Sequence, residues 1–535
     1  MSGDAPHLLL VAADDHTPTL ARPVSVTGAA RHPTSAAGAP THLWSEGDHP
    51  DDLAAQRWAV FAPEGPTGDA LLEPLAPLIA HRSAQQGADA KILRVPAGLD
   101  AAAAARWKKQ ALAGVSRLIS EVPRYHLLLG DLDQVSLELQ TILAADGFVG
   151  RLAFDARDHY AAYVDKLLRA ERAAASPVPR AIFHTVHDGT PATSLGYQAL
   201  LKPGLALAQT ALPTATLVPS GDAEPDLGPL VRLARVTQPT VLFSLSHGEG
   251  APRGGWRTAG EQRARQGAMS FGRAGRITGD DLARAAFLPD GVWLMLACFS
   301  AGTPRTSKYQ RWLAELAAHG QFPGNLDAVT ASLPAAGAPP FVAALPKAAL
   351  ANPQGPLAFI GHIDLAWSYS FRELDGPTAF NRPGRFVQAV TALLRGRRVG
   401  VAFRELFRFF EQTNTELTAL EESGARDPLR RAHLWMLRQD LAGFVVLGDP
   451  AARLPVSSDT SRPAAPAPAP DPAAFFPGMQ VTRPPAAAAS FFPGMTVTPA
   501  APAPDTERLE RAIGQVLADP RALASAAQQA QLDPR

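Results

Sequence analysis

The sequence predicts an α/β fold: an α/β/α sandwich with a mostly parallel sheet. Two observations support this prediction. Between residues 57 and 455, short apolar runs rich in β-branched and aromatic residues alternate with segments of helical periodicity. Several of the apolar runs end abruptly in small or polar residues, which is typical of buried strands that lead into loops. Such strands belong to sheets that helices cover on both faces.

Composition narrows the class of protein. Lys plus Arg and Asp plus Glu each number 50, so the formal net charge is zero and we expect no nucleic-acid partner. The single cysteine excludes an internal disulfide framework and a multi-cysteine zinc site. The first residues do not resemble a secretory signal, and no apolar run reaches the length of a membrane span. We therefore expect a cytoplasmic protein with no membrane span, no metal and no cofactor.

The first part of the chain predicts two regions. Residues 1–56 are rich in Pro, His, Thr and Gly, which indicates an irregular segment with one strand at residues 7–12. Residues 57–178 predict a first, non-catalytic α/β subdomain. We expect its strands at 58–61, 91–95, 125–129 and 148–154, and its helices at 71–85, 101–113 and 158–170.

Residues 179–455 predict a second α/β subdomain, which carries the candidate site. We expect strands at 181–186 and 215–219, within 240–250 and 291–302, and at 357–360 and 444–447. The expected helices are 197–208, 227–234, 277–286, 386–422 with an interruption near 396–400, and 428–441.

The remaining residues differ in composition. Residues 456–505 are dominated by Pro and Ala, which cannot form a core, so we expect a disordered, extended linker. The pentapeptide FFPGM occurs in it twice, and we interpret it as a docking motif for a partner or for the catalytic part. Duplication of a low-complexity segment is the alternative. The aromatic residues concerned are Phe475, Phe476, Phe491 and Phe492. Residues 506–535 predict a C-terminal helical segment.

The candidate site rests on the stretches TVLFSLSHGEG and GVWLMLACFSAG. The first strand leads into His247-Gly248 and the second into Cys298, and 298 − 247 = 51 residues separate the imidazole from the thiol. A strand–helix–strand crossover makes the two strands parallel, so both loops leave the same edge of the sheet. A thiol and an imidazole at adjacent strand ends are what a cysteine nucleophile requires.

Each residue of this pair also has a simpler interpretation. A lone cysteine is most often a small buried hydrophobic residue, and a lone histidine is usually a satisfied hydrogen-bonding group. The occurrence of both at successive strand ends, with the histidine upstream, favours the catalytic pair. The same order occurs in caspases, although the sequence around their cysteine differs.

Several segments between Tyr125 and Leu454 resemble, in order, the caspase-like (clan CD) cysteine peptidases of the gingipain type, a bacterial family of C25-like peptidases. These segments are YHLLLGD, GFVGRLAFDARDHYAAYVDKLLRAE, SHG, LACFSAG, AFIGHIDLAWSYSF and FVVLGDPAARL. The resemblance implies a Cys–His peptidase on a caspase-like fold. The stretch PATSLGYQAL after Asp188 lacks the acidic residue expected for arginine selection. Arginine specificity and secretion are therefore not carried over.

We assign the following candidate roles. Cys298 attacks the scissile carbonyl, and His247 protonates the leaving amine and then activates water. The backbone N–H groups of Gly248 and Cys298 face the oxyanion. Asp188 follows the strand expected beside the histidine strand and orients His247, as an acid in the matching loop does in the resembled family. The alternatives are an ordinary turn glycine at Gly248 and a solvated loop aspartate at Asp188.

Asp364 and Trp367 are candidates for the pocket that holds the P1 side chain, the residue before the cleaved bond. A tryptophan wall and a carboxylate would favour a basic P1 residue. The alternative is a turn cap at Asp364 and a core residue at Trp367. The stretch 250–276 carries six arginines, which we interpret as solvated charges on a mobile loop; selection of an acidic substrate is the alternative. They are Arg253, Arg257, Arg263, Arg265, Arg273 and Arg276.

The leading functional hypothesis is an intracellular cysteine endopeptidase that cleaves a dedicated partner protein in a bacterial regulatory or defence pathway. A catalytically silent scaffold that binds partners through its C-terminal motifs is the second hypothesis. A third is a thiol hydrolase that uses the same pair on small substrates.

Overall fold

The structure is a computed structural model that describes residues 7–25, 49–115, 121–221, 225–375, 378–424, 427–457, 479–482 and 496–499. The chain divides into two compact units, residues 1–458 and residues 459–535. No helix among the described residues is both long enough and apolar enough to cross a membrane.

A ten-stranded sheet forms the centre of the first unit, in the order β3-β2-β4-β5-β18-β15-β12-β8-β6-β7. Its strands are β2 (Trp58–Pro63), β3 (Lys91–Val95), β4 (Tyr125–Leu129), β5 (Phe148–Leu152), β6 (Arg180–Thr185), β7 (Thr216–Ser220), β8 (Thr240–Leu245), β12 (Val292–Leu296), β15 (Ala358–His362) and β18 (Phe444–Gly448). All neighbours are parallel except β15 and β18, which pair antiparallel. The predicted mostly parallel sheet is therefore confirmed.

The antiparallel pair divides the sheet into two sets of five strands that run in opposite directions. One set contains the strands between residues 58 and 152 together with β18, which comes from the end of the first unit. The other contains β6, β7, β8, β12 and β15. Because β6, β8, β12 and β15 are parallel to one another, their carboxyl ends lie at one edge of the sheet and their loops meet there.

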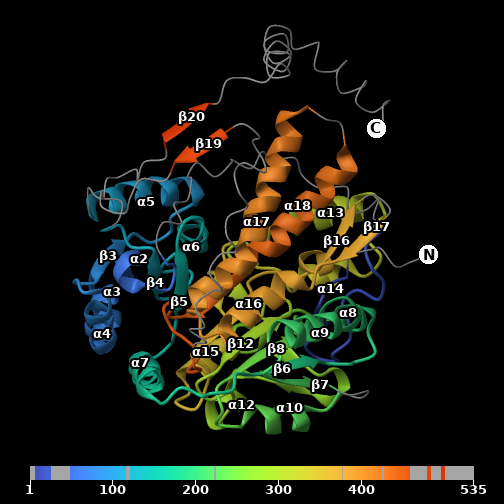
Figure 1. Cartoon of the computed structure of the whole chain (residues 1–535). Coiled ribbons are helices and arrows are strands. Elements are labelled where there is room, and N and C mark those ends of the chain that lie inside the picture. The colour runs from blue at the N-terminus through green and yellow to red at the C-terminus, as the bar shows by residue number, and fades with distance from the viewer. Residues whose placement is uncertain are drawn as a thin grey trace. The chain divides into compact units, whose positions relative to one another are not determined.

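Two layers of helices flank the sheet (Figure 1). In one, α9 (Lys202–Ala211), α16 (Gly384–Leu394), α17 (Val399–Glu422) and α18 (Pro428–Ala442) pack in succession. In the other, α12 (Gly279–Arg284), α15 (Ala344–Ala351), α7 (Arg157–Arg172) and α4 (Ala76–Gln86) do the same. The central strands are buried along their whole length, which explains their continuous apolar sequences.

The other helices are short or lie at the edges of these layers. They are α2 (Leu53–Gln56), α3 (Gly65–Leu72), α5 (Ala101–Val115), α6 (Leu137–Ala144), α8 (Pro191–Gly196), α10 (Leu227–Ala234), α11 (Ala259–Arg265), α13 (Gln310–Ala318) and α14 (Leu326–Thr330). The helix expected over residues 71–85 is two helices, because Pro74 and Pro77 each remove a backbone donor and a 3₁₀ turn at Glu73–Leu75 separates α3 from α4.

A smaller sheet, in the order β1-β9-β10-β11, begins just beyond the end of β8, where His247 starts strand β9. It consists of β1 (Leu10–Ala12), β9 (His247–Gly250), β10 (Met269–Ser270) and β11 (Arg276–Ile277). The N-terminal strand β1 is thus half the length expected for residues 7–12. It lies parallel to β9, with Leu10 opposite Gly248. Two-stranded pairs are formed by β13 (Gly302–Thr303) with β14 (Phe341–Val342), and by β16 (Arg372–Asp375) with β17 (Thr378–Asn381).

In the second unit, β19 (Met479–Thr482) and β20 (Thr496–Pro499) pair antiparallel. Val481 lies opposite Val497 and Thr482 lies opposite Thr496, so the residues that follow the two FFPGM copies pair with each other. The four FFPGM phenylalanines and the expected helix after residue 505 lie outside the described residues.

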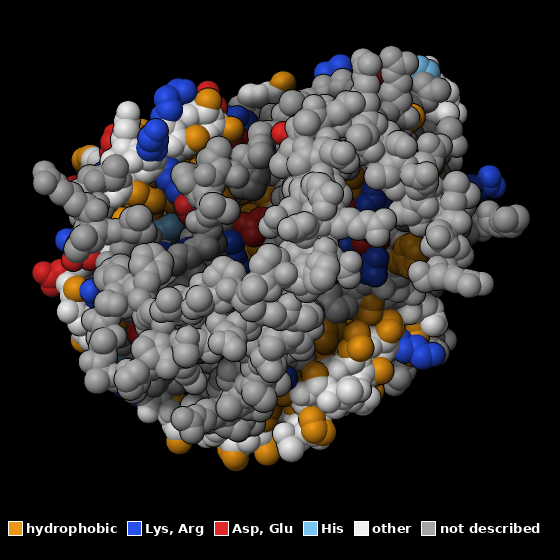
Figure 2. All heavy atoms as spheres, turned by 45° about the horizontal axis from the view of Figure 1, so that its top comes forward, with side chains coloured by type: hydrophobic (Ala, Val, Ile, Leu, Met, Phe, Trp, Pro, Cys, Tyr) orange, Lys and Arg blue, Asp and Glu red, His pale blue; other side chains and the backbone are white. Residues whose placement is uncertain are grey.

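On the face drawn in Figure 2, side chains of both charge signs are visible, as the zero net charge leads one to expect.

Candidate functional site

The four parallel strands β6, β8, β12 and β15 bring the candidate residues to one edge of the sheet. Leu245 of β8 lies opposite Leu296 of β12, so the loops that begin with Ser246 and Ala297 leave the sheet together. The predicted adjacency of the histidine and cysteine strands is confirmed by this register. Asp188 follows β6, the other neighbour of β8, and Asp364 and Trp367 follow β15, the other neighbour of β12.

The Gly248 and Cys298 backbones lie against each other. A Cβ atom added to Gly248 would be 1.9 Å from the Cys298 carbonyl oxygen, so only glycine fits there. The N–H groups of Gly248 and Cys298 both donate to the Leu9 carbonyl oxygen, at 3.0 and 3.3 Å. Two N–H groups that converge on one carbonyl oxygen have the geometry of an oxyanion hole.

A sharp turn follows the cysteine. Phe299 has a φ of 54°, a left-handed conformation that is uncommon for a residue other than glycine. Its N–H donates to the Asp364 carbonyl at 2.9 Å, which ties the turn to the loop after β15. Residues in such conformations are concentrated at functional sites, where the surrounding structure holds them.

His247 is fully buried, and its Nε2 atom lies 2.9 Å from Thr190 Oγ1 and 3.7 Å from Asp188 Oδ2. The Thr190 hydroxyl donates to Asp188 Oδ1 at 2.8 Å, and Thr193 Oγ1 donates to the same oxygen at 2.7 Å. Since the Thr190 proton is committed to Asp188, its oxygen accepts from His247 Nε2–H. The buried Nδ1 atom, which has no hydrogen-bond partner, then carries the lone pair that a general base needs.

Burial decides the protonation states of this pair. It lowers the pKa of His247, while Asp188 and the Leu9 carbonyl act in the opposite direction. Burial raises the pKa of the Cys298 thiol well above its ordinary value. The N–H groups of Ala366 and Leu9 lower this pKa and offset only part of the increase. In this enclosed state both groups are therefore neutral at pH 7, and the Cys298 thiol donates to the Ala366 carbonyl oxygen at 3.6 Å.

The segment after β15 packs against the thiol. Ala366 N–H donates to Cys298 Sγ at 3.2 Å. Asp440, in α18, accepts the N–H groups of Trp367 and Ser370, both at 2.8 Å, and so fixes this segment. Asp440 is fully buried, and burial raises its pKa to about 7.

The two residues expected in the P1 pocket are enclosed. The Asp364 carboxylate accepts from Ser307 Oγ at 2.8 Å, from Lys308 N–H at 3.0 Å and from Leu365 N–H at 2.8 Å. Burial raises its pKa to about 6. Trp367 is fully buried and packs against Tyr309 and Trp312. Asp364 also lines a cavity of 330 Å³ between α6, α18 and residues 304–309.

The loop arginines are only partly solvated. Glu249, next to Gly248 in the sequence, is buried, and its Oε1 atom lies 2.8 Å from Arg276 and 3.4 Å from Arg265. The interpretation of this stretch as solvated charges on a mobile loop is therefore wrong for Arg265 and Arg276, because a buried carboxylate requires cationic partners. Arg253 forms a more exposed ion pair with Asp15 at 2.6 Å.

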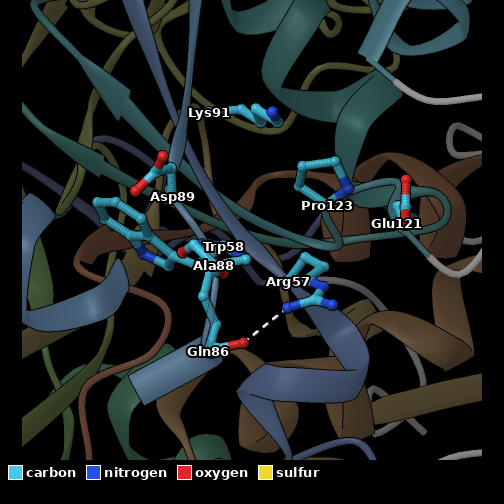
Figure 3. A pocket seen from close by; sticks show the side chains of 8 residues that line it. All are labelled: Arg57, Trp58, Gln86, Ala88, Asp89, Lys91, Glu121 and Pro123. Atoms are coloured by element: carbon cyan, nitrogen blue, oxygen red, sulfur yellow. Dashed lines mark hydrogen bonds between the residues drawn. The ribbon is translucent and has the colours of Figure 1, made fainter. Parts of the chain in front are cut away.

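A second hollow, of 240 Å³, lies at the far end of the large sheet, beside β2 and β3 (Figure 3). In it Arg57 donates to the Gln86 carbonyl at 2.6 Å, and Asp89, Lys91 and Glu121 supply charges of both signs. Its lining contains no thiol, hydroxyl or imidazole group. Within the described ranges there is no cluster of three His, Cys, Asp or Glu side chains that could hold a metal ion.

Sequence reasoning did not find Thr190, Ala366, Asp440 or Leu9 as parts of the site. Thr190 could have been noticed from its spacing, since Asp188 and a threonine two residues later form a common turn motif. Ala366 acts through its backbone, which no side-chain pattern indicates.

An α/β chain that gathers a thiol, an imidazole, a carboxylate and two converging N–H groups at one sheet edge contains the parts of a thiol nucleophile's site. No known protein-family model matches the chain, and no curated protein sequence matches it significantly.

The chain is similar to solved cysteine proteinase structures. Against the Arg-specific cysteine proteinase gingipain R (RgpB) the identity is 12% and the TM-score 0.42, over 76% of this chain and 80% of that one. Against the complex of the Porphyromonas gingivalis RgpB pro- and mature domains the values are 12% and 0.41, over 74% and 79%. Against a structure described as a protease they are 13% and 0.40, over 74% and 78%.

Proposed function

We propose that the chain is a cysteine endopeptidase that cleaves peptide bonds with Cys298 and His247. The observation that carries this proposal is the convergence of the Gly248 and Cys298 N–H groups on one carbonyl oxygen, beside the only thiol of the chain. A carbonyl so held is polarised, and its carbon becomes a target for the sulfur.

The reaction would proceed in two steps. In the first, His247 Nδ1 takes the thiol proton, Sγ attacks the scissile carbonyl carbon, and the carbon–nitrogen bond breaks as the imidazolium gives its proton to the leaving amine. A thioester remains. In the second, the imidazole takes a proton from water, hydroxide attacks the thioester, and the acid leaves as Sγ regains a proton.

Asp188 and Thr190 would support both steps. The imidazole becomes a cation after it takes the proton, and a buried cation is costly without a counter-charge. Asp188 supplies this charge at 3.7 Å, and the Thr190 hydroxyl fixes the ring through Nε2. This arrangement stabilises the imidazolium and keeps Nδ1 free for the reacting proton.

We also propose an intracellular setting and a dedicated partner protein in a bacterial regulatory or defence pathway, with the FFPGM copies as docking motifs. Phenylalanine pairs in a Pro/Ala-rich stretch are suited to filling apolar pockets of a partner. Changing Phe475, Phe476, Phe491 and Phe492 to Ala would abolish cleavage of such a protein and leave cleavage of short peptides unchanged. Equal loss of both would contradict a docking role.

The experiment that tests the enzymatic proposal is hydrolysis of a fluorogenic peptide library with a varied P1 residue. Wild type, Cys298→Ala and His247→Ala are compared, with Ser457→Ala as a matched substitution outside the site. The proposal is supported if wild type and Ser457→Ala hydrolyse the peptides while Cys298→Ala and His247→Ala do not. A catalytically silent scaffold would hydrolyse nothing, and a thiol hydrolase would prefer small thioesters to peptides.

A further inference from the structure

The N-terminal segment of the chain lies in the candidate site. Residues Leu8, Leu9 and Leu10 are exposed by only 3, 1 and 0%. Leu10 begins β1, which is parallel to β9, the short strand that begins with His247. Leu8 forms an antiparallel bridge with Trp367, in the segment that contacts the thiol. The chain thus passes between the two loops that carry His247 and Cys298 and the loop after β15.

The hydrogen bonds of this segment are those of a bound peptide. Leu9 N–H donates to the Ala366 carbonyl at 3.3 Å, and His7 N–H donates to Ser368 Oγ at 3.2 Å. The Leu9 carbonyl accepts from Gly248 and Cys298 N–H. Extended peptides commonly bind by adding a strand to an exposed edge, with backbone hydrogen bonds for affinity and side-chain pockets for selectivity.

The residues that follow β1 are also held in place by hydrogen bonds and ion pairs. The Ala13 carbonyl accepts from Arg265 Nη2 at 2.5 Å, and His16 Nδ1 lies 3.7 Å from the buried Glu249 carboxylate. Asp15 pairs with Arg253 at 2.6 Å. The arginines of the loop after β9 therefore hold residues 13–16 and keep the preceding leucines in place.

We infer that residues 7–12 occupy the substrate groove as an intramolecular ligand with Leu9 at the P1 position, and that the enzyme therefore selects an aliphatic P1 residue. This inference rests on the proposed peptidase function. It follows because the residue whose carbonyl lies between the oxyanion N–H groups is the one whose bond would be cleaved, and here that residue is leucine.

The surroundings of Asp364 agree with an aliphatic residue. A basic P1 side chain would require a carboxylate that is accessible to it and not already neutralised within the fold. Asp364 is only 5% exposed; its Oδ1 atom accepts from Ser307 and Leu365, and its Oδ2 atom accepts from Lys308 N–H. The basic P1 preference considered from the sequence is therefore replaced by an apolar one.

The test has two arms on the full-length protein. In the first, the P1 library is assayed and peptide aldehydes with the sequence acetyl-His-Leu-X are used as inhibitors, where X is Leu, Arg or Asp. We expect at least a tenfold preference for Leu at P1, both in hydrolysis of the library and in inhibition by the aldehydes. In the second, Leu9→Gly is compared with Leu207→Gly, a matched change at a leucine that is 46% exposed on α9. We expect Leu9→Gly to raise kcat/KM about tenfold, because a weaker ligand leaves the groove more often, and Leu207→Gly to change nothing.

The outcomes separate this inference from the proposed function. Hydrolysis that prefers Arg or Asp at P1, or Leu9→Gly activity equal to wild type, overturns the inference while the peptidase proposal stands. No hydrolysis by wild type or by Leu9→Gly, with both proteins folded by circular dichroism, overturns the peptidase proposal. If Leu9→Gly is unfolded, inhibition of the wild type by the aldehydes decides the P1 residue.

Discussion

The Thr190 hydroxyl lies between His247 and Asp188, 2.9 Å from the imidazole Nε2 atom and 2.8 Å from the carboxylate. It links a buried base to a buried acid, so the imidazole ring and its tautomer are fixed before any substrate arrives. The Thr190 hydroxyl thus connects the Asp188 carboxylate to the imidazole, whose Nε2 atom lies 3.7 Å from Asp188 Oδ2.

Replacing Thr190 with valine should lower kcat and leave KM nearly unchanged. The change keeps the side chain's shape but removes the hydroxyl that accepts from Nε2–H, so the ring loses its orientation. The cost of one such hydrogen bond, about 1–1.5 kcal/mol, corresponds to about a tenfold loss in rate. Steady-state kinetics on the best library peptide measure kcat and KM for wild type and Thr190→Val. Thr210→Val, at an exposed position on α9, is the matched control; equal losses in both variants would contradict the assigned role.

Replacing Gly248 with alanine should abolish most of the activity. The new Cβ atom would lie 1.9 Å from the Cys298 carbonyl oxygen, so the two backbones must separate and the oxyanion donors lose their alignment. Loss of one such donor typically lowers the rate by about two to three orders of magnitude. Gly254→Ala is the control, because no atom lies within 4 Å of its added Cβ. Undiminished kcat/KM in a folded Gly248→Ala protein would show that these N–H groups do not act in the reaction.

The thiol should be unreactive at neutral pH in the resting protein. Burial raises the pKa of Cys298, so the thiolate, which is the reactive form, is scarce at pH 7 and increases as the pH rises. Alkylation by iodoacetamide, followed by intact-protein mass spectrometry, should therefore accelerate about tenfold per pH unit between pH 6 and 9. A rate independent of pH over that range would mean that the thiolate is already formed.

Asp440 should make the stability of the protein depend on pH in a defined direction. Its pKa is raised by burial from 3.8 to about 7, so the folded protein binds a proton that the unfolded chain releases between these values. This group therefore destabilises the fold fully above pH 7, and the destabilisation falls progressively as the pH drops from 7 towards 3.8. Asp440→Asn, which is neutral throughout, removes this dependence.

We expect the free energy of unfolding of Asp440→Asn to exceed that of wild type most at pH 8. The excess should shrink by about 1.4 kcal/mol for each pH unit below 7, as linkage requires. Urea unfolding at pH 8, 7, 6 and 5 measures it. A difference that is constant across these values would show that Asp440 keeps its charge in the fold over the whole range.

The sequence predicted much of the architecture because buried strands have distinctive apolar runs. The stretches that became β4, β8, β12 and β15 were located within one to a few residues, and the parallel pairing of β8 with β12 followed from the crossover between them. The position of β18 could not be predicted in this way. A five-residue apolar run carries no sign of its direction, and β18 lies between β5 and β15, antiparallel to the latter.

The candidate site was partly predictable for the same reason. His247, Gly248, Cys298 and Asp188 follow strand ends, and the parallel sheet brings those ends together. The contacts of Leu9 and Ala366 involve backbone atoms, which every residue possesses, so nothing in their side chains indicates the site. The enclosure of Asp364 by Ser307 and Lys308 depends on a loop whose path the sequence does not define.

Cys298 is the proposed nucleophile, and its sulfur should displace chloride from a peptide chloromethyl ketone bound in the groove. The most direct measurement is intact-protein mass spectrometry after incubation with an acetyl-His-Leu-Leu chloromethyl ketone, followed by peptide mapping. We expect a single adduct on Cys298, a much slower reaction in His247→Ala and none in Cys298→Ala. Modification of Cys298→Ala to the same extent, or an adduct on another residue of the wild type, would contradict it.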